Sequence, residues 1–271
     1  MLAQITALVN TTGVQFFASN TDNFQMAFID APNQRNPIAQ FESSRADYLF
    51  ANNSMVSMMN TKADPRRAFY FVAFPYGSTS YKGVTPGDPA GVNYSRIHSY
   101  LRGTASGTPT PNAAGGITAT ALTYTGAAPI RMLTFAEYNF IRAEAALRGA
   151  PGDAQAFFTA GITASMQAVG VAAADITTYL AANGTLTGTF DQKLKQIIEE
   201  KYVANFGVAV EPWNDYRRTG YPALVPPSNR MPEVINVPRS LFYPQVEIDL
   251  NTSAPEQKPT DLQTRVFWDT P

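Results

Sequence analysis

Several residue types on which catalytic and structural sites depend are absent or nearly absent from this chain. Cysteine does not occur, and His98 is the only histidine among the 271 residues. Thiol chemistry, disulfide frameworks and zinc sites built from cysteine and histidine are therefore excluded, and a serine–histidine–aspartate triad would depend on a single imidazole. The sequence predicts neither a metal site nor a cofactor.

Charge and long hydrophobic runs are also scarce. Twenty Lys plus Arg balance twenty-one Asp plus Glu, and neither sign forms a long run, so we expect no nucleic-acid partner. No stretch of about eighteen apolar residues could form a membrane span, and Met1 to Asn10 lacks the pattern of a signal peptide. Taken by itself, the chain is expected to be soluble.

Motifs of common enzyme classes are missing as well. No glycine-rich phosphate loop, G-x-S-x-G elbow or H-E-x-x-H motif occurs. Adjacent Glu199 and Glu200 would project about 100° apart on a helix, so they cannot both face one glycosidic bond. We therefore predict no catalytic residue, and a hydrolase ranks third among the functions considered.

Hydrophobic spacing predicts a mainly α protein. Thr134 and Glu137 have the spacing of a capping box, and Asp153 can cap the next helix. The cluster of methionines near residue 58 is interpreted as core filler. The predicted helices cover about residues 1–12, 41–60, 133–147, 153–169, 173–182 and 190–204, with a turn at Pro65 followed by a short strand.

The segment 75–129 differs from the rest, because Gly, Pro, Ser, Thr and Ala dominate it and helical periodicity disappears. A loop this long inside a compact domain usually carries function or is disordered. Its aromatic and polar side chains can stack on apolar faces and bond hydroxyls, or they can simply anchor the loop. The candidate ligand contacts are Tyr76, Tyr81, Tyr94, Arg96, His98 and Tyr100.

The stretch "EPWNDYRRTGYPAL" (211–224) is predicted to be structural. Adjacent Arg217 and Arg218 point in different directions on a helix, so they cannot clamp one phosphate together. We expect arginine–carboxylate and arginine–backbone contacts that hold this helix to the tail, with Trp213 and Arg217 mostly buried. Nine prolines after Tyr221 predict an extended C-terminal tail.

Several stretches together resemble the SusD/RagB family, the surface glycan-binding lipoproteins of Bacteroidetes-type bacteria. They are "NNSMVSMMNTKADPRRAFYF", "LTFAEYNFIRAEAALRG", "AGITASMQAVGV", "LKQIIEEKYVANFGVAVEPWNDYRRTGYPAL", "VPRSLFYPQVEIDLN" and "TRVFWDTP". Their order and spacing cover nearly all of residues 42–271.

The resemblance implies a tetratricopeptide-like helical body with a long irregular region and an extended proline-rich tail. Residues 1–271 would form one SusD-like domain, the C-terminal portion of the family fold, with the loop insertion at about 75–129. The N-terminal half of that fold, with its signal peptide and lipidated cysteine, is expected to be absent. The parent protein would lie at the outer membrane, held by a lipid anchor that is missing here.

Two functions follow as competing hypotheses. The first is non-catalytic binding of an oligosaccharide or polysaccharide for delivery to a SusC-like TonB-dependent outer-membrane transporter. The alternative is a protein-interaction or lid module of that transporter, with peptide or another nutrient as cargo, because tetratricopeptide-like helix pairs commonly present surfaces to proteins.

Overall fold

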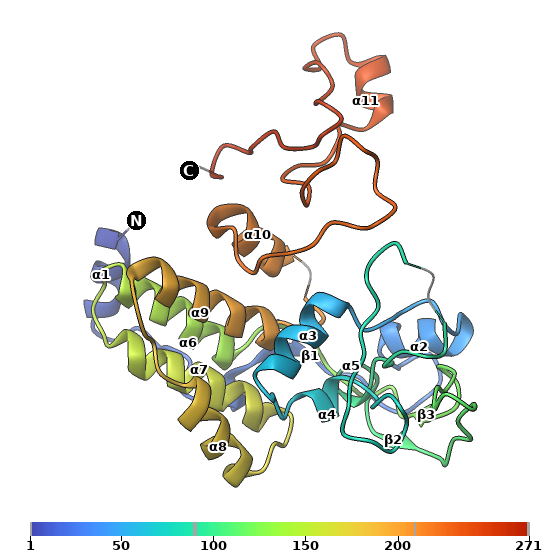
Figure 1. Cartoon of the computed structure of the whole chain (residues 1–271). Helices are drawn as coiled ribbons and strands as arrows, with labels where there is room; N and C mark the ends of the chain where they lie inside the picture. Colours follow the sequence, from blue (N-terminus) through green and yellow to red (C-terminus); the bar gives the residue numbers. More distant parts are fainter. Residues whose placement is uncertain (1, 89–90, 209, 270–271) are drawn as a thin grey trace.

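The computed structural model describes residues 2–88, 91–208 and 210–269, and its regular structure is mostly helical (Figure 1). None of the helices in these ranges is long and apolar enough to cross a membrane. The helices are α1 (Leu2–Asn10), α2 (Pro37–Ser44), α3 (Asn53–Thr61), α4 (Arg67–Tyr70), α5 (Ser99–Arg102), α6 (Phe135–Leu147), α7 (Ala154–Ala168), α8 (Ala173–Asn183), α9 (Phe190–Ala204), α10 (Val210–Thr219) and α11 (Gln245–Leu250). A 3₁₀ turn, η1, covers Asn20–Asp22.

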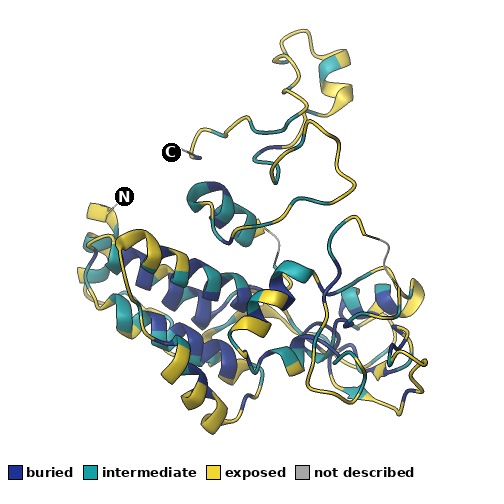
Figure 2. Ribbon diagram, in the orientation of Figure 1, coloured by how far each residue is buried: buried dark blue, intermediate teal, exposed yellow. Residues whose placement is uncertain are grey.

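Helices α6, α7 and α9 form the main body, with their inner faces buried against one another (Figures 1 and 2). Phe140 of α6, Ile162 of α7 and Ile197 of α9 are fully buried at the centre of this core. A Cβ atom at Gly161 would lie 2.8 Å from the Phe140 ring, so the absence of a side chain lets α6 and α7 approach closely. The helices predicted over residues 133–147 and 153–169 are thus present as α6 and α7, and they pack closely against each other.

A second core joins the short helices α3, α4 and α5 to the end of α9. Met55 and Met59 of α3 are buried here, which confirms that the methionine cluster fills a core. Tyr70 of α4 stacks on Phe206 with ring centroids 4.8 Å apart and donates a hydrogen bond to the carbonyl of Val203. This core holds α4 in position beside the candidate site.

Strands are few and short among the described residues. β1 (Phe24–Met26) pairs antiparallel with β4 (Ile130–Leu133), and β2 (Ala105–Ser106) pairs antiparallel with β3 (Thr123–Tyr124). The register opposes Met26 to Ile130 in the first pair and Ala105 to Tyr124 in the second. Apart from β2, β3 and α5, the described parts of this segment, 75–88 and 91–129, are irregular, as predicted.

The predicted helix over residues 41–60 is wrong, because α2 and α3 are separate. Glu42 accepts a hydrogen bond from the backbone of Leu49 at 2.9 Å, and Asp47 adopts a left-handed backbone with φ 70°. Asn52 then caps α3. The chain bends here so that the carboxylates of Glu42 and Asp47 face inward to a buried arginine, which helical periodicity cannot reveal.

Two other local predictions need correction. The strand expected after Pro65 is the helical turn α4. In the turn before it, the Asp64 carboxylate accepts the backbone N–H of Arg66 at 2.9 Å. Thr134 does cap α6, but Glu137 does not return the second half of a capping box. Its carboxylate instead accepts from Asn205 of the chain after α9 at 2.9 Å, so a tertiary contact replaces the local one.

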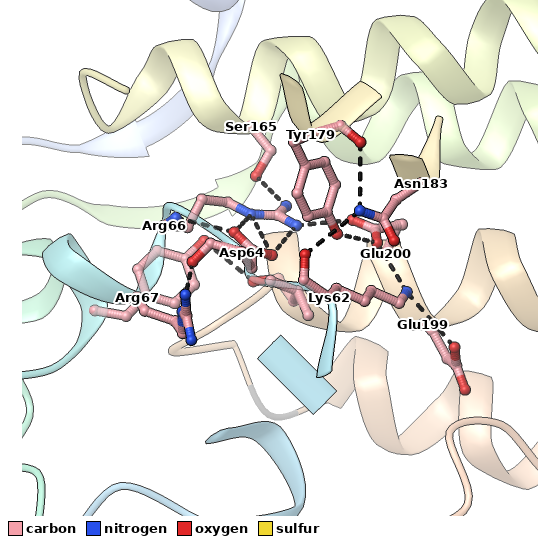
Figure 3. A network of polar contacts seen from close by, with 11 residues as sticks. Lys62, Asp64, Arg66, Arg67, Ser165, Tyr179, Asn183, Glu199 and Glu200 are labelled. Carbon is pink, nitrogen blue, oxygen red and sulfur yellow. Dashed lines mark hydrogen bonds and ion pairs between the residues drawn. The ribbon is translucent and has the colours of Figure 1, made fainter. Parts of the chain in front are cut away.

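A buried ionic network ties the turn before α4 to the helical body (Figure 3). Arg66 is fully buried, and its guanidinium donates to Asp64 at 2.5 Å and to Glu200 of α9 at 2.7 Å. The same guanidinium donates to Ser165 of α7 at 3.0 Å, while Tyr179 of α8 donates to Glu200 at 2.7 Å. One arginine therefore connects α4, α7, α8 and α9.

Charge compensation keeps this network ionised. Burial alone would raise the pKa of Glu200, but the charges of Lys62 and Arg66 outweigh burial and lower that pKa to about 2. Lys62 adds an ion pair to Glu200 at 2.9 Å and lies 3.6 Å from Glu199. Glu200 is thus a structural anion rather than half of a catalytic carboxylate pair.

Helix α10 docks on the body through a second set of ion pairs. Lys201 of α9 lies 2.9 Å from Asp215 and 3.5 Å from Glu137. Arg218 of α10 binds Glu144 of α6 with two hydrogen bonds of 2.5 and 2.6 Å and also contacts Asp215. The prediction that this stretch forms an arginine–carboxylate network is confirmed.

Arg217 points the other way and holds the tail. Its guanidinium lies between the rings of Trp213 and Trp268, 3.8 and 4.3 Å from their centroids. It also donates to the carbonyl of Arg239, and the Trp213 indole donates to the carbonyl of Pro238 at 2.8 Å. Arg217 is buried as predicted, whereas Trp213 is half-buried.

Replacing Arg66 with Met should lower the free energy of unfolding by about 3 to 5 kcal/mol, because Asp64 and Glu200 would be left buried with too little positive charge. Chemical denaturation measures the change. Lys195→Met is the matched control, since Lys195 is exposed and 3.8 Å from Glu199, and it should cost less than about 0.5 kcal/mol. Equal effects of both substitutions would contradict a central role for Arg66.

Replacing Trp213 with Ala should destabilise the protein by about 3 kcal/mol, because the ring that stacks on Arg217 and the hydrogen bond to Pro238 are both lost. Thermal melts test this expectation. Phe267→Ala serves as the control, since Phe267 is 94% exposed and should leave the melting temperature unchanged. A wild-type melt for Trp213→Ala would show that the ring does not hold the tail.

Candidate functional site: a hollow beside α4

The backbone around residues 70–76 and 95–98 positions three of the candidate contacts. Val72 donates to the carbonyl of Arg96 at 2.8 Å, and His98 donates to the carbonyl of Tyr70 at 2.9 Å. Further along, the backbone N–H of Tyr76 donates to the carbonyl of Gly115 at 2.8 Å. The irregular region is thereby held against α4, which is itself fixed by the second core.

Arg96 is an internal anchor of this region. Its side chain is 1% exposed, and its guanidinium lies 2.8 Å from Asp47 and 3.5 Å from Glu42. The guanidinium also covers the ring of Phe50 at 4.2 Å. A ligand at the surface cannot reach this side chain, so we do not propose Arg96 as a contact.

Tyr100 is likewise placed inside the fold, at 7% exposure. Its ring lies 4.5 Å from the ring of Tyr70 and 3.8 Å from the guanidinium of Arg131, and its hydroxyl donates to the carbonyl of Ala204. The ring and the hydroxyl group are therefore both engaged by other parts of the chain. Tyr100 belongs to the core that supports the site.

The structure brings Tyr76, Tyr81 and His98 together around one hollow of about 430 Å³. We call this the His98 hollow. Ala68 of α4 and Ser106 of β2 also line it. Each of the three candidate side chains is half-buried, so each is anchored at one side and accessible at the other.

Tyr94 lies apart from this group, because it lines neither the His98 hollow nor the adjoining one described below. The ammonium group of Lys82 covers its ring at 4.6 Å from the centroid. Tyr94 therefore offers a comparison residue of the same type in the same loop.

The imidazole of His98 is neutral at physiological pH. Burial, followed by the positive charge of Arg102, lowers the pKa of His98 from 6.5 to about 4. Its Nδ1 atom lies 2.7 Å from the hydroxyl of Tyr124, and its Nε2 atom makes no hydrogen bond with any described residue. In either neutral tautomer Nε2 can bond a hydroxyl group, because a hydroxyl both donates and accepts.

A second hollow, of about 530 Å³, adjoins the first. Ala68 and Tyr81 line both, while Arg67, Thr79 and Asp175 line only the second. We call it the Asp175 hollow. Sequence reasoning missed it because Asp175 lies on α8, about a hundred residues away along the chain, and no motif links it to the loop.

These two hollows offer aromatic faces, hydroxyl groups, one neutral imidazole and a few charged groups. Such an arrangement can stack on the apolar face of a ring-shaped ligand and bond its polar edge. Within the described ranges, no three His, Asp or Glu side chains gather closely enough to hold a metal ion.

Comparison with known proteins identifies the family. Residues 1–244 match the sequence model of a SusD-like family described as "Starch-binding associating with outer membrane". The chain therefore belongs to the SusD-like family, as the resemblance of its motifs predicted. A search of curated proteins gave no match.

Solved structures of SusD homologues have the same fold. A chitin-binding SusD homologue from Flavobacterium johnsoniae is 27% identical with a TM-score of 0.71. The match covers 98% of this chain and 57% of the homologue. A homologue from Bacteroides fragilis is 24% identical with a TM-score of 0.73, and the match covers 92% of this chain and 56% of the homologue. A third homologue, from Bacteroides thetaiotaomicron, is 22% identical with a TM-score of 0.69, and the match covers 99% of this chain and 63% of the homologue.

The chain thus spans somewhat more than half the length of these relatives. The predicted fold class, a mainly α and tetratricopeptide-like body with an irregular region, is confirmed by the helices and by these neighbours.

The burial of His98 has a direct test. The folded state disfavours the imidazolium, so the stability that His98 contributes is present above pH 6.5 and is lost as the pH falls through about 4. Because His98 is the only histidine, its imidazole signal in a proton NMR titration is unambiguous. The midpoint should lie near 4, and a midpoint near 6.5 would show that the ring is solvated.

Proposed function

We propose that this chain binds an oligosaccharide or polysaccharide without modifying it. The observation that carries the proposal is the His98 hollow, where two tyrosine rings and a neutral imidazole line one accessible space beside a rigid helix. Sugar rings present apolar C–H faces and hydroxyl edges, and aromatic side chains with a polar tip suit both. A neutral imidazole accepts or donates hydrogen bonds without the cost of desolvating a charge.

The relatives support this choice of ligand. The family is described as starch-binding, and the Flavobacterium johnsoniae homologue is described as chitin-binding. Hydrolysis of a glycosidic bond normally uses two carboxylates, whereas the His98 hollow offers stacking and hydrogen bonding. Release of reducing sugar from a bound polysaccharide, abolished by an Asp or Glu substitution, would overturn the non-catalytic part of the proposal.

Delivery to a transporter is the second part of the proposal. We propose that the protein acts at the bacterial cell surface, attached to the outer membrane by a lipid anchor outside this sequence, and passes its glycan to a SusC-like TonB-dependent transporter. The family description as associating with the outer membrane supports this location. Co-purification with such a transporter tests the partner, and its failure would leave the glycan site standing.

A protein-interaction role with peptide cargo remains the alternative, and one observation favours a protein surface. Phe24, Met26 and Met132 of the β1–β4 ribbon are 60%, 55% and 41% exposed. Exposed apolar groups of this size often mark contacts with another protein. Peptide and glycan titrations side by side separate the two cargo classes.

Loss of a tyrosine ring from the His98 hollow should weaken glycan binding. Tyr76→Ala and Tyr81→Ala are each expected to cost about 1 kcal/mol or more of binding free energy, because a stacking face disappears. Affinity gel electrophoresis against a panel including soluble starch and a soluble chitin derivative identifies the ligand, and calorimetry measures the loss.

Tyr94→Ala is the matched control, since its ring lies outside both hollows. Tyr81→Phe keeps the ring and should retain most of the affinity. Thermal melts of each variant separate a lost contact from a lost fold. If Tyr94→Ala weakens binding while Tyr76→Ala and Tyr81→Ala do not, the His98 hollow is not the site.

A further inference from the structure

The proposed glycan site does not end at the His98 hollow. Tyr81 and Ala68 line both hollows, so the two hollows lie side by side along these residues. Binding sites for small molecules commonly measure about 300 to 1,000 Å³. At about 430 and 530 Å³, each hollow is large enough to hold a separate part of a ligand.

We infer that the Asp175 hollow is a second subsite, and that the ligand is an oligosaccharide of at least two sugar units that straddles Tyr81. This inference rests on the proposed function. It assigns roles to Arg67, Thr79 and Asp175 and predicts that affinity depends on ligand length, because a monosaccharide would fill only one of the two hollows.

Arg67 lines the second subsite, and its guanidinium group is held in place by other residues. Its Nε atom donates to the carbonyl of Asp64 at 2.8 Å, and its Nη1 atom donates to Asn60 at 2.8 Å. The guanidinium also lies 5.3 Å from the ring centroid of Tyr81. These contacts fix the group, while Nη2 makes no hydrogen bond with the described residues and keeps its two N–H donors for a ligand.

Asp175 supplies the matching acceptor. It lies in the first turn of α8, and its carboxylate makes neither a hydrogen bond nor an ion pair with the described residues. A carboxylate can accept hydrogen bonds from two neighbouring sugar hydroxyls, and the Thr79 hydroxyl can donate or accept beside it. Arg67 and Asp175 carry opposite charges, so the hollow suits a neutral polyhydroxylated ligand.

The buried ionic network fixes α8 relative to the segment at α4, and both of these line the Asp175 hollow. The residue before Arg67 is Arg66, which binds Glu200, and Glu200 accepts from Tyr179, one turn after Asp175 on α8. The wall from α8 and the wall from the segment at α4 therefore share one set of buried contacts (Figure 3). When both subsites are already in place, a ligand that fills both loses less free energy to ordering the protein and binds more tightly.

The test measures affinity against chain length. Chito-oligosaccharides and malto-oligosaccharides of one to six units serve as probes in calorimetric titrations of the 271-residue chain. We expect at least one series to bind, with affinity rising roughly tenfold once the ligand is long enough to reach the second hollow, equivalent to about 1.4 kcal/mol.

A blocking variant isolates the second hollow. Ala172 is exposed and lines only the Asp175 hollow, whereas its neighbour Ala173 is exposed and lines neither. Ala172→Trp should remove the gain with chain length, and Ala173→Trp should bind like the wild type. Asp175→Asn, which changes charge but not shape, should weaken only the longer oligosaccharides, by about threefold to tenfold.

The outcomes separate this inference from the proposed function. If Tyr76→Ala loses affinity while Ala172→Trp and Asp175→Asn bind every chain length like the wild type, the glycan site stands and the second subsite is overturned. Binding by neither series of oligosaccharides, nor by any polysaccharide of the panel, overturns both. Circular dichroism confirms that each variant is folded.

Discussion

The buried guanidinium of Arg66 is the interaction on which the rest of the structure depends. Placing this charge in the interior is possible because Asp64 and Glu200 compensate it and Ser165 satisfies a further donor. The geometry is demanding, since four elements must meet at one planar group. These contacts join the segment at α4 directly to α7 and α9, and to α8 through Glu200 and Tyr179.

That arrangement determines the candidate site. Arg67 and Ala68 directly follow the buried arginine, so both hollows are built on a segment whose position is fixed by the core. Asp175 belongs to α8, whose Tyr179 joins the same network. The irregular segment then adds Tyr76, Tyr81 and His98 from one side. A rigid helical body and a loop that carries the binding side chains are the usual division of labour in binding proteins.

Sequence reasoning succeeded where the signal is local. Capping residues and apolar spacing predicted the helices that begin at Phe135, Ala154 and Phe190, and glycine and proline content predicted the irregular region. It failed where the local structure depends on contacts between residues far apart in the sequence. The break between α2 and α3 exists because Glu42 and Asp47 turn toward Arg96, and the Asp175 hollow needs α8 beside α4. No spacing within the sequence encodes either contact.

The aromatic side chains of the loop show why composition alone could not separate contacts from anchors. Tyr100 and Tyr81 are the same residue type in the same irregular region. Tyr100 packs against Tyr70 and Arg131 and is buried in the core. Tyr81 has Arg67 beside its ring and is only half-buried, between the two hollows. A tyrosine is free for a ligand only when the fold leaves part of its ring uncovered. That property belongs to the packing of α4 and α5, which the buried network and the second core determine together.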